Sequence, residues 1–289
     1  MNLLKLQLND LLIHEYEYAR DNMASEAVVF QLSAGLALVG IAVGWRGLMT
    51  KYHAVYDQST AWAQIFWGLV LGAITASLGH ISLFLPYYEM VQFDGASPTG
   101  GVRILDLFIV VVLMGLASHF ILRRERVREE HAHMTAGWAF GLAVGAMFAM
   151  VMTFMSLGFY RSWLNLQLII SLLGYVLIIP RAEAIITCYQ GYLMLNGRRW
   201  GAILRASVWR VLNLTILYYS FFDPLAWVFI GPTVFFFSQK ADSWMWSMMT
   251  NDEKRTYRKN IKEEKLKAKQ ASLAHSQTIS EDSVTSQEE

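Results

Sequence analysis

Residues 136–159 read AGWAFGLAVGAMFAMVMTFMSLGF, a run without Asp, Glu, Lys or Arg. An α-helix needs about 20 mostly apolar residues to cross the roughly 30 Å hydrocarbon core of a bilayer, so this run is long enough for one crossing. Small residues recur in it at four-residue intervals: Gly137, Gly141, Gly145 and Ala149. Because residues four apart share one face of a helix, a second helix can approach this stripe closely. The stretch predicts a membrane-spanning helix packed against a neighbour.

Other apolar stretches of the chain have a similar length. Three are clear predicted spans, at residues 27–48, 62–85 and 104–122. A shorter run at residues 164–179 crosses fully only if its helix continues beyond Pro180. Small residues recur at the same spacing on two of these spans: Gly40 and Gly44, then Gly68, Gly72 and Ala76. Such stripes serve packing within one chain or against a second chain, and both uses stay open.

The last apolar block, residues 206–239, is too long for one ordinary span and is interrupted at Asp223-Pro224 and Gly231-Pro232. We interpret it as a hairpin, either two short crossings or a re-entrant pair of half-helices. We favour two crossings because the turn at Asp223 resembles an interfacial corner with an aromatic belt around it. The predicted fold is therefore all-α, a polytopic transmembrane helical bundle of seven spans, or of five spans plus a re-entrant hairpin.

The composition also indicates a membrane protein, since 55% of the residues are hydrophobic and 16% are charged. The formal net charge is only +1, so we expect no nucleic-acid partner. Cationic residues are retained in the cytoplasm during insertion, and most fall on one side when the N-terminus is outside. Residues 123–128 alone contribute four arginines to that side. We predict an N-out, C-in protein of the plasma membrane, which would be the inner membrane of a bacterium.

The chain divides by composition into four regions. Residues 1–25 show an amphipathic helical pattern and are expected to lie along the interface or a partner. Residues 26–248 form the transmembrane helical domain. Residues 249–270 are rich in lysine and predict a basic cytoplasmic helix at the membrane surface. Residues 271–289 are acidic and nearly free of residues to bury, so they predict a disordered tail.

Ionisable residues at membrane depth are costly and mark candidate functional sites. If the fifth helix persists, Arg181 and Glu183 enter the membrane or its inner edge. They could pair with each other, with Arg210, or with an anionic headgroup or substrate. With Asp223 in the hairpin, these residues form a candidate polar path. The interpretation we favour is an interfacial elbow, in which span five ends at Pro180 and the following residues lie flat on the membrane.

The histidines give weak support for a metal or cofactor. His131 and His133 would point about 200° apart on a helix and lie beside arginines, so they are only weak candidate metal ligands and we expect no metal site. His80 and His119 lie at different depths in the predicted topology, which argues against them as the two axial ligands of one haem. We therefore expect no cofactor.

Catalytic motifs such as HExxH, GxSxG, Walker A, GxGxxG and CxxC are missing from the sequence, which argues against an enzyme. The leading hypothesis is a non-catalytic scaffold or accessory subunit of a membrane assembly. Its expected partners are membrane lipids and either another membrane protein or a second copy of this chain. The alternative is a transporter or channel with a polar path at the hairpin of residues 206–239. An intramembrane lipid-modifying enzyme is the third hypothesis.

Overall fold

The computed structural model of the protein describes residues 26–52, 56–92, 95, 104–159, 166–263, 266–267 and 269–270. The predicted N-terminal segment 1–25 and the predicted acidic tail 271–289 lie outside these residues. The described residues form helices and their connections, with no strand among them. The all-α prediction is confirmed.

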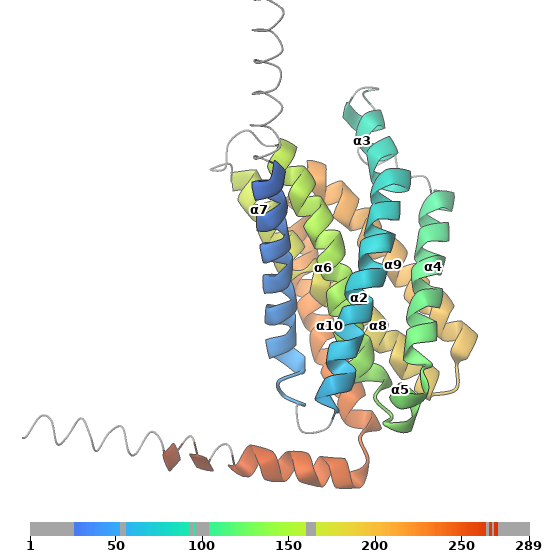
Figure 1. The fold of residues 1–289 in the computed structure, drawn as a ribbon, viewed down its shortest axis with the longest axis vertical. Helices are drawn as coiled ribbons and strands as arrows, with labels where there is room; N and C mark the ends of the chain where they lie inside the picture. Colours follow the sequence, from blue (N-terminus) through green and yellow to red (C-terminus); the bar gives the residue numbers. More distant parts are fainter. Residues whose placement is uncertain are drawn as a thin grey trace, which may run out of the picture.

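Long helices lie side by side in a bundle, and a further helix of residues 251–263 crosses beneath one end of it (Figure 1). The first helix of the bundle is Glu26–Leu48. It is followed in chain order by α2 (Gln58–Gly79), a π-helical turn (His80–Phe84), α3 (Leu85–Gln92), α4 (Ile104–Leu122), α5 (Glu125–Glu129), α6 (His133–Phe159), α7 (Leu166–Leu177), α8 (Ile179–Leu195), α9 (Arg199–Phe222) and α10 (Ala226–Met248).

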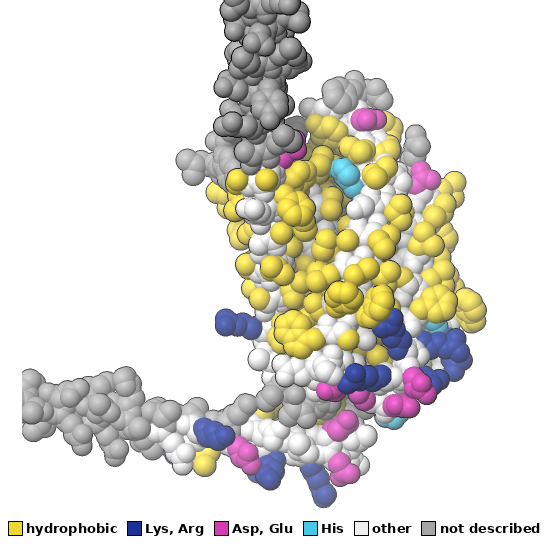
Figure 2. Space-filling model, viewed as in Figure 1, with side chains coloured by type: hydrophobic (Ala, Val, Ile, Leu, Met, Phe, Trp, Pro, Cys, Tyr) yellow, Lys and Arg dark blue, Asp and Glu magenta, His cyan; other side chains and the backbone are white. Residues whose placement is uncertain are grey.

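Five helical stretches among the described residues are long and apolar enough to cross a membrane. They are Glu26–Leu48, Gln58–Gln92, Leu105–Leu122, His133–Gly158 and Leu166–Leu195. Each contains or overlaps one of the five single spans expected from the sequence. Hydrophobic side chains cover the middle of the bundle surface, and most of the visible charged side chains lie towards one end (Figure 2). This distribution is the one expected of a surface that faces lipid.

The junction between α7 and α8 decides how the chain passes Pro180. Ile178 lies between the two helices and keeps a near-helical backbone, with φ −96° and ψ −49°. Its N–H donates to the carbonyl of Gly174 at 2.9 Å, and its own carbonyl accepts from the N–H of Ala182 at 2.8 Å. Pro180 occupies the first turn of α8, where a missing N–H costs little. The helical path therefore continues, and α8 is a mostly buried element of the bundle. The favoured interpretation of this segment as a flat interfacial elbow is wrong, because Leu166–Leu195 forms one continuous helical stretch.

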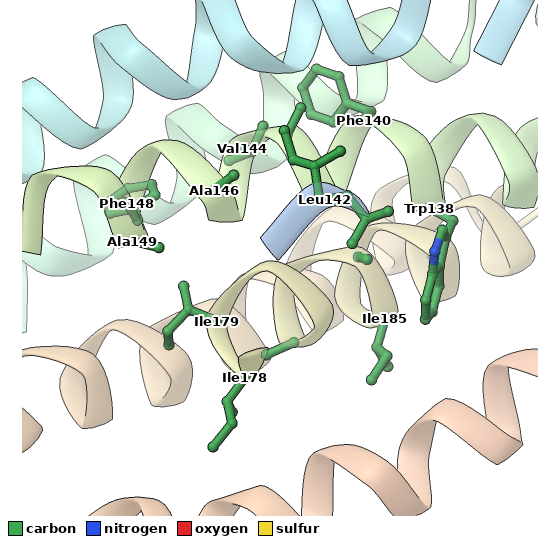
Figure 3. Packing of buried hydrophobic residues seen from close by; sticks show 14 of the residues in the cluster. Trp138, Phe140, Leu142, Val144, Ala146, Phe148, Ala149, Ile178, Ile179 and Ile185 are labelled. Atoms are coloured by element: carbon green, nitrogen blue, oxygen red, sulfur yellow. The ribbon is translucent and has the colours of Figure 1, made fainter. Parts of the chain in front are cut away.

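The contact between α6 and α8 forms the centre of the bundle. A Cβ atom built on Gly141 would lie 2.6 Å from the Cα of Ala184, and one built on Gly145 would lie 2.6 Å from the Cα of Pro180. Gly137 makes a similar approach to the carbonyl of Thr187. The two backbones therefore touch along the small-residue stripe of α6, and buried apolar side chains of both helices lie around this contact (Figure 3).

The small residues of the first two long helices also lie at contacts within the chain. A Cβ built on Gly68 would lie 2.5 Å from the carbonyl oxygen of Phe140 in α6. One built on Gly40 would lie 2.7 Å from the carbonyl oxygen of Val176 in α7. The remaining members of the stripes are buried as well: Gly44, Gly72, Ala76 and Ala149. Of the two uses that the sequence left open, the structure shows these residues in internal packing.

The block of residues 206–239 belongs to a hairpin of two long helices. α9 has 24 residues and α10 has 23, and the turn between them lies at residues 223–225. At a rise of 1.5 Å per residue, each helix is about 35 Å long. Pro232 lies inside α10 without ending it. α8 packs against both α9 and α10, so the hairpin is part of the bundle.

The helix of residues 251–263 docks on the end of the bundle through an aromatic contact. The ring of Tyr257 is buried and stacks on Tyr52, with 5.5 Å between the ring centroids. The hydroxyl of Tyr52 donates to the carboxylate of Asp242 in α10 at 2.7 Å, and Lys51 forms an ion pair with the same carboxylate at 2.6 Å. Burial and this hydrogen bond raise the pKa of Tyr52 above its usual value. The connection after the first helix therefore holds α10 and the final helix together.

Candidate functional site

A buried ion pair joins α8 to α9 inside the bundle. Arg210 of α9 has an exposed fraction of 0%, and Glu183 of α8 has one of 3%. The Nε of Arg210 lies 2.5 Å from the Oε1 of Glu183. An isolated charge at such a position would cost several kcal/mol, so each charged group depends on the other for its stability in this state. The pair that the sequence suggested between these two residues is formed.

The rest of the guanidinium is bound by neutral polar side chains. The Nη1 of Arg210 donates to the Oε1 of Gln190 at 3.0 Å. The Nη2 donates to the hydroxyl oxygens of Thr187 at 2.9 Å and of Ser118 at 3.1 Å. Because Ser118 lies in α4, Arg210 joins three helices, α4, α8 and α9. We call Arg210, Glu183, Gln190, Thr187 and Ser118 the buried network.

The acceptors of the network are themselves held by further hydrogen bonds. The Nε2 of Gln190 donates to the carbonyl of Gly115 in α4 at 2.9 Å. The hydroxyl of Thr187 donates to the carbonyl of Glu183 at 3.0 Å, and that of Ser118 donates to the carbonyl of Met114 at 2.7 Å. These bonds fix the orientation of each acceptor around the guanidinium. The network is chemically suited to holding helices together in an apolar interior, where paired charges gain most from complete hydrogen bonding.

The other two residues of the candidate polar path lie outside this network. Arg181 is half-buried, and its guanidinium lies over the ring of Phe235 in α10, 4.9 Å from the ring centroid. Asp223 belongs to the turn between α9 and α10, where it accepts hydrogen bonds from the Tyr219 hydroxyl and the Leu225 N–H, each at 3.1 Å. The structure therefore brings Glu183 and Arg210 together and gives Arg181 and Asp223 separate local contacts.

The candidate residues predicted from the sequence do not include Gln190, Thr187 and Ser118. A signal was present in α8, because Glu183, Thr187 and Gln190 are spaced four and three residues apart and therefore share one helix face. A face of three polar side chains in a largely apolar helix indicates a buried partner for them. The partner helix could not be read from the same pattern.

A second polar feature is a cavity of about 390 Å³ at the end of the bundle where α4 ends and α6 and α9 begin. His119 and His133 are buried in its wall, and the exposed side chain of His131 also lines it. His131 precedes α6 and has a φ of 50°, so the two weak metal candidates reach one cavity without sharing a helix. Within the described part of the chain, no three His, Cys, Asp or Glu side chains are grouped to hold a metal ion.

The short α5 that borders this cavity is anchored to α2. Arg126 donates to the carboxylate of Asp57 and to the hydroxyl of Ser59, at 2.7 and 2.6 Å. Asp57 caps the N-terminus of α2, and hydrogen bonds from Ser59 and Thr60 hold the pKa of its carboxyl well below its usual range. The carboxylate is therefore charged at neutral pH and available to Arg126. Arg124 lies over the ring of Trp67 at 4.3 Å, a second contact of this connection with α2.

The chain was compared with known protein families, with curated proteins and with solved structures, and none of them matches it.

Proposed function

We propose that the protein is a seven-span plasma-membrane protein, N-out and C-in, that acts by binding as a non-catalytic scaffold or accessory subunit of a membrane assembly. The observation that carries this proposal is the buried network. The charged groups deepest in the bundle bind one another and neutral side chains of the same chain. Their geometry serves cohesion between helices, which leaves the outer surfaces for contacts with other molecules.

The lengths and surfaces of α9 and α10 support seven spans. Each helix is about 35 Å long, which is sufficient for a bilayer core of roughly 30 Å. Both carry large hydrophobic side chains that are exposed in the isolated chain, as lipid-facing residues are: Leu204, Val208 and Leu212 on α9, and Val228, Phe235 and Phe236 on α10. A re-entrant pair of half-helices would be shorter and would require protein or water around its turn.

The distribution of cationic residues supports the orientation. The connection of residues 123–128, the start of α9 and the helix of residues 251–263 lie at the same end of the bundle (Figure 1). Lys and Arg side chains gather at this end in the space-filling view (Figure 2). The positive-inside rule assigns such an end to the cytoplasm.

Binding is better supported than transport because the residues of the candidate polar path are not assembled into one path. Arg181 packs on Phe235, and Asp223 belongs to a turn. The small-residue stripes face other helices of the same chain, so they are occupied by internal packing. The exposed cationic side of the helix of residues 251–263 is the surface we assign to a partner at the cytoplasmic face.

The seven-span topology predicts opposite sides for the two ends of α9. Arg198 and Leu225 are exposed, and the natural Cys188 has an exposed fraction of 0%, so it should not react in the folded chain. In intact cells, a membrane-impermeant maleimide should label Leu225→Cys at once and Arg198→Cys only after permeabilisation. The natural chain, treated in parallel, should stay unlabelled. Labelling of both variants only after permeabilisation would instead support five spans with a re-entrant hairpin.

The scaffold proposal predicts a partner that co-purifies with the full chain in mild detergent. Arg255→Gln with Lys262→Gln, which neutralises two exposed cationic residues of the final helix, should reduce the recovered partner at least fivefold. Asp252→Asn, a charge change of opposite sign on the same helix, is the matched control and should not reduce it. Recovery of the chain alone as a monomer would contradict the proposal. So would solute flux into liposomes that a normally folded Glu183→Gln variant abolishes, which would favour the transporter.

A further inference from the structure

The cavity between α4, α6 and α9 has a composition that points to an anionic ligand. Three arginines line it, Arg123, Arg128 and Arg199, together with the acidic side chain of Glu129. With its histidines neutral, the cavity therefore carries two excess positive charges. None of the three arginines takes part in the ion pairs that the described residues form. Their side chains are exposed at the rim and remain available to a ligand.

We propose that this cavity binds a phosphate group, carried either by a phospholipid headgroup or by a small soluble phosphate ester. The planar guanidinium of arginine matches the oxygens of phosphate and forms two parallel charge-assisted hydrogen bonds with it. Arg199 of α9, Arg128 of α5 and Arg123, which precedes α5, approach one cavity, so more than one of them can contact the same group. A volume of about 390 Å³ lies within the usual range of small-molecule sites.

Two buried histidines belong to the wall of the cavity. His119 and His133 have exposed fractions of 8% and 6%, and the Nδ1 atom of each is buried without a hydrogen-bond partner. Buried polar atoms in folded proteins nearly always have a partner, because an unpaired one costs free energy. Both Nδ1 atoms are closed to solvent, so the arginines, not these Nδ1 atoms, would supply the hydrogen bonds to a phosphate in the cavity.

Helix dipoles do not explain the positive character of the cavity. α6 and α9 begin there and contribute the positive ends of their dipoles, but α4 and α8 end there and contribute negative ends. The contributions oppose each other, so the arginines determine the charge. Met194 and Leu195 form an apolar part of the wall. That wall suits an ester with a carbon skeleton better than inorganic phosphate.

The test uses the purified full-length chain in detergent and three probes. Native mass spectrometry measures the binding of dioleoyl phosphatidic acid, with dioleoyl phosphatidylcholine as the reference lipid. Calorimetric titration measures the binding of glycerol 3-phosphate and of inorganic phosphate. Saturable binding of phosphatidic acid alone supports the proposal and assigns the site to a lipid headgroup. Saturable binding of glycerol 3-phosphate supports it with a soluble ester as the ligand.

Variants show whether binding depends on the arginines of the cavity or on the general positive charge of the surface. Arg199→Gln should weaken binding at least tenfold, whereas Arg205→Gln, at an exposed position of the same helix outside the cavity lining, should change it less than twofold. Glu129→Gln removes a repulsive carboxylate and should tighten binding severalfold. Because these side chains are exposed, the unliganded variants should unfold at the temperature of the natural chain. Failure of all three probes to bind saturably, or equal weakening by Arg199→Gln and Arg205→Gln, overturns the proposal.

Discussion

The Arg210→Met variant is expected to lose about 3–5 kcal/mol of its free energy of unfolding, the usual cost of removing one partner from a buried ion pair. The substitution leaves the carboxylate of Glu183, with an exposed fraction of 3%, without its cation. It also removes the donors that Gln190, Thr187 and Ser118 accept from. Unfolding of the chain in dodecyl maltoside with increasing mole fractions of dodecyl sulfate, followed by circular dichroism, measures the loss.

A double variant separates the cost of an unpaired charge from the loss of packing. Glu183→Gln added to Arg210→Met removes both charges at nearly unchanged volume, and it should recover a large part of the lost stability. The matched control is Arg205→Met, an exposed arginine of the same helix, which should change the stability by less than about 0.5 kcal/mol. If Arg210→Met and Arg205→Met had equal effects, the buried network would not hold α4, α8 and α9 together.

The apolar spans could be predicted because a bilayer core demands a run of about 20 apolar residues, whatever the packing. The ends of these spans are predicted less accurately. The second predicted span ends at residue 85, before Pro86, but the helical stretch continues to Gln92. A π-helical turn at His80–Phe84 widens the helix immediately before Pro86. The wider turn accommodates the ring of Pro86, which would clash with a regular preceding turn. No simple sequence pattern predicts such a π-helical turn.

The charged part of the candidate site could be predicted because ionisable residues stand out in apolar helices. Glu183 and Arg210 were recognised for this reason. Their pairing with each other, and the separate contacts of Arg181, depend on how α8 is rotated against α9 and α10. That rotation is set by many side-chain contacts together. The cavity could not be predicted either, because it is formed by the ends of α4, α6, α8 and α9, which are distant in sequence.

Gly141→Ala is expected to lower the free energy of unfolding by about 1–3 kcal/mol, although alanine is the better helix former. The added Cβ would lie 2.6 Å from both the Cα of Ala184 and the carbonyl oxygen of Glu183. Backbone atoms cannot move aside as a flexible side chain can, so α6 and α8 must separate. The same unfolding titration measures the loss. Gly35→Ala is the control, since a Cβ there meets nothing within 4 Å and should be neutral or stabilising by up to about 1 kcal/mol.

Two further measurements distinguish internal packing from packing between two chains. Gly145→Ala acts on the same contact, because its Cβ would lie 2.6 Å from the Cα of Pro180. Once α6 and α8 have separated for Gly141→Ala, the second Cβ meets less resistance, so the double variant should lose less than the sum of the two single losses. The loss should also be independent of protein concentration, because no second chain takes part. A loss that shrinks on dilution would show that the glycine stripe stabilises an oligomer.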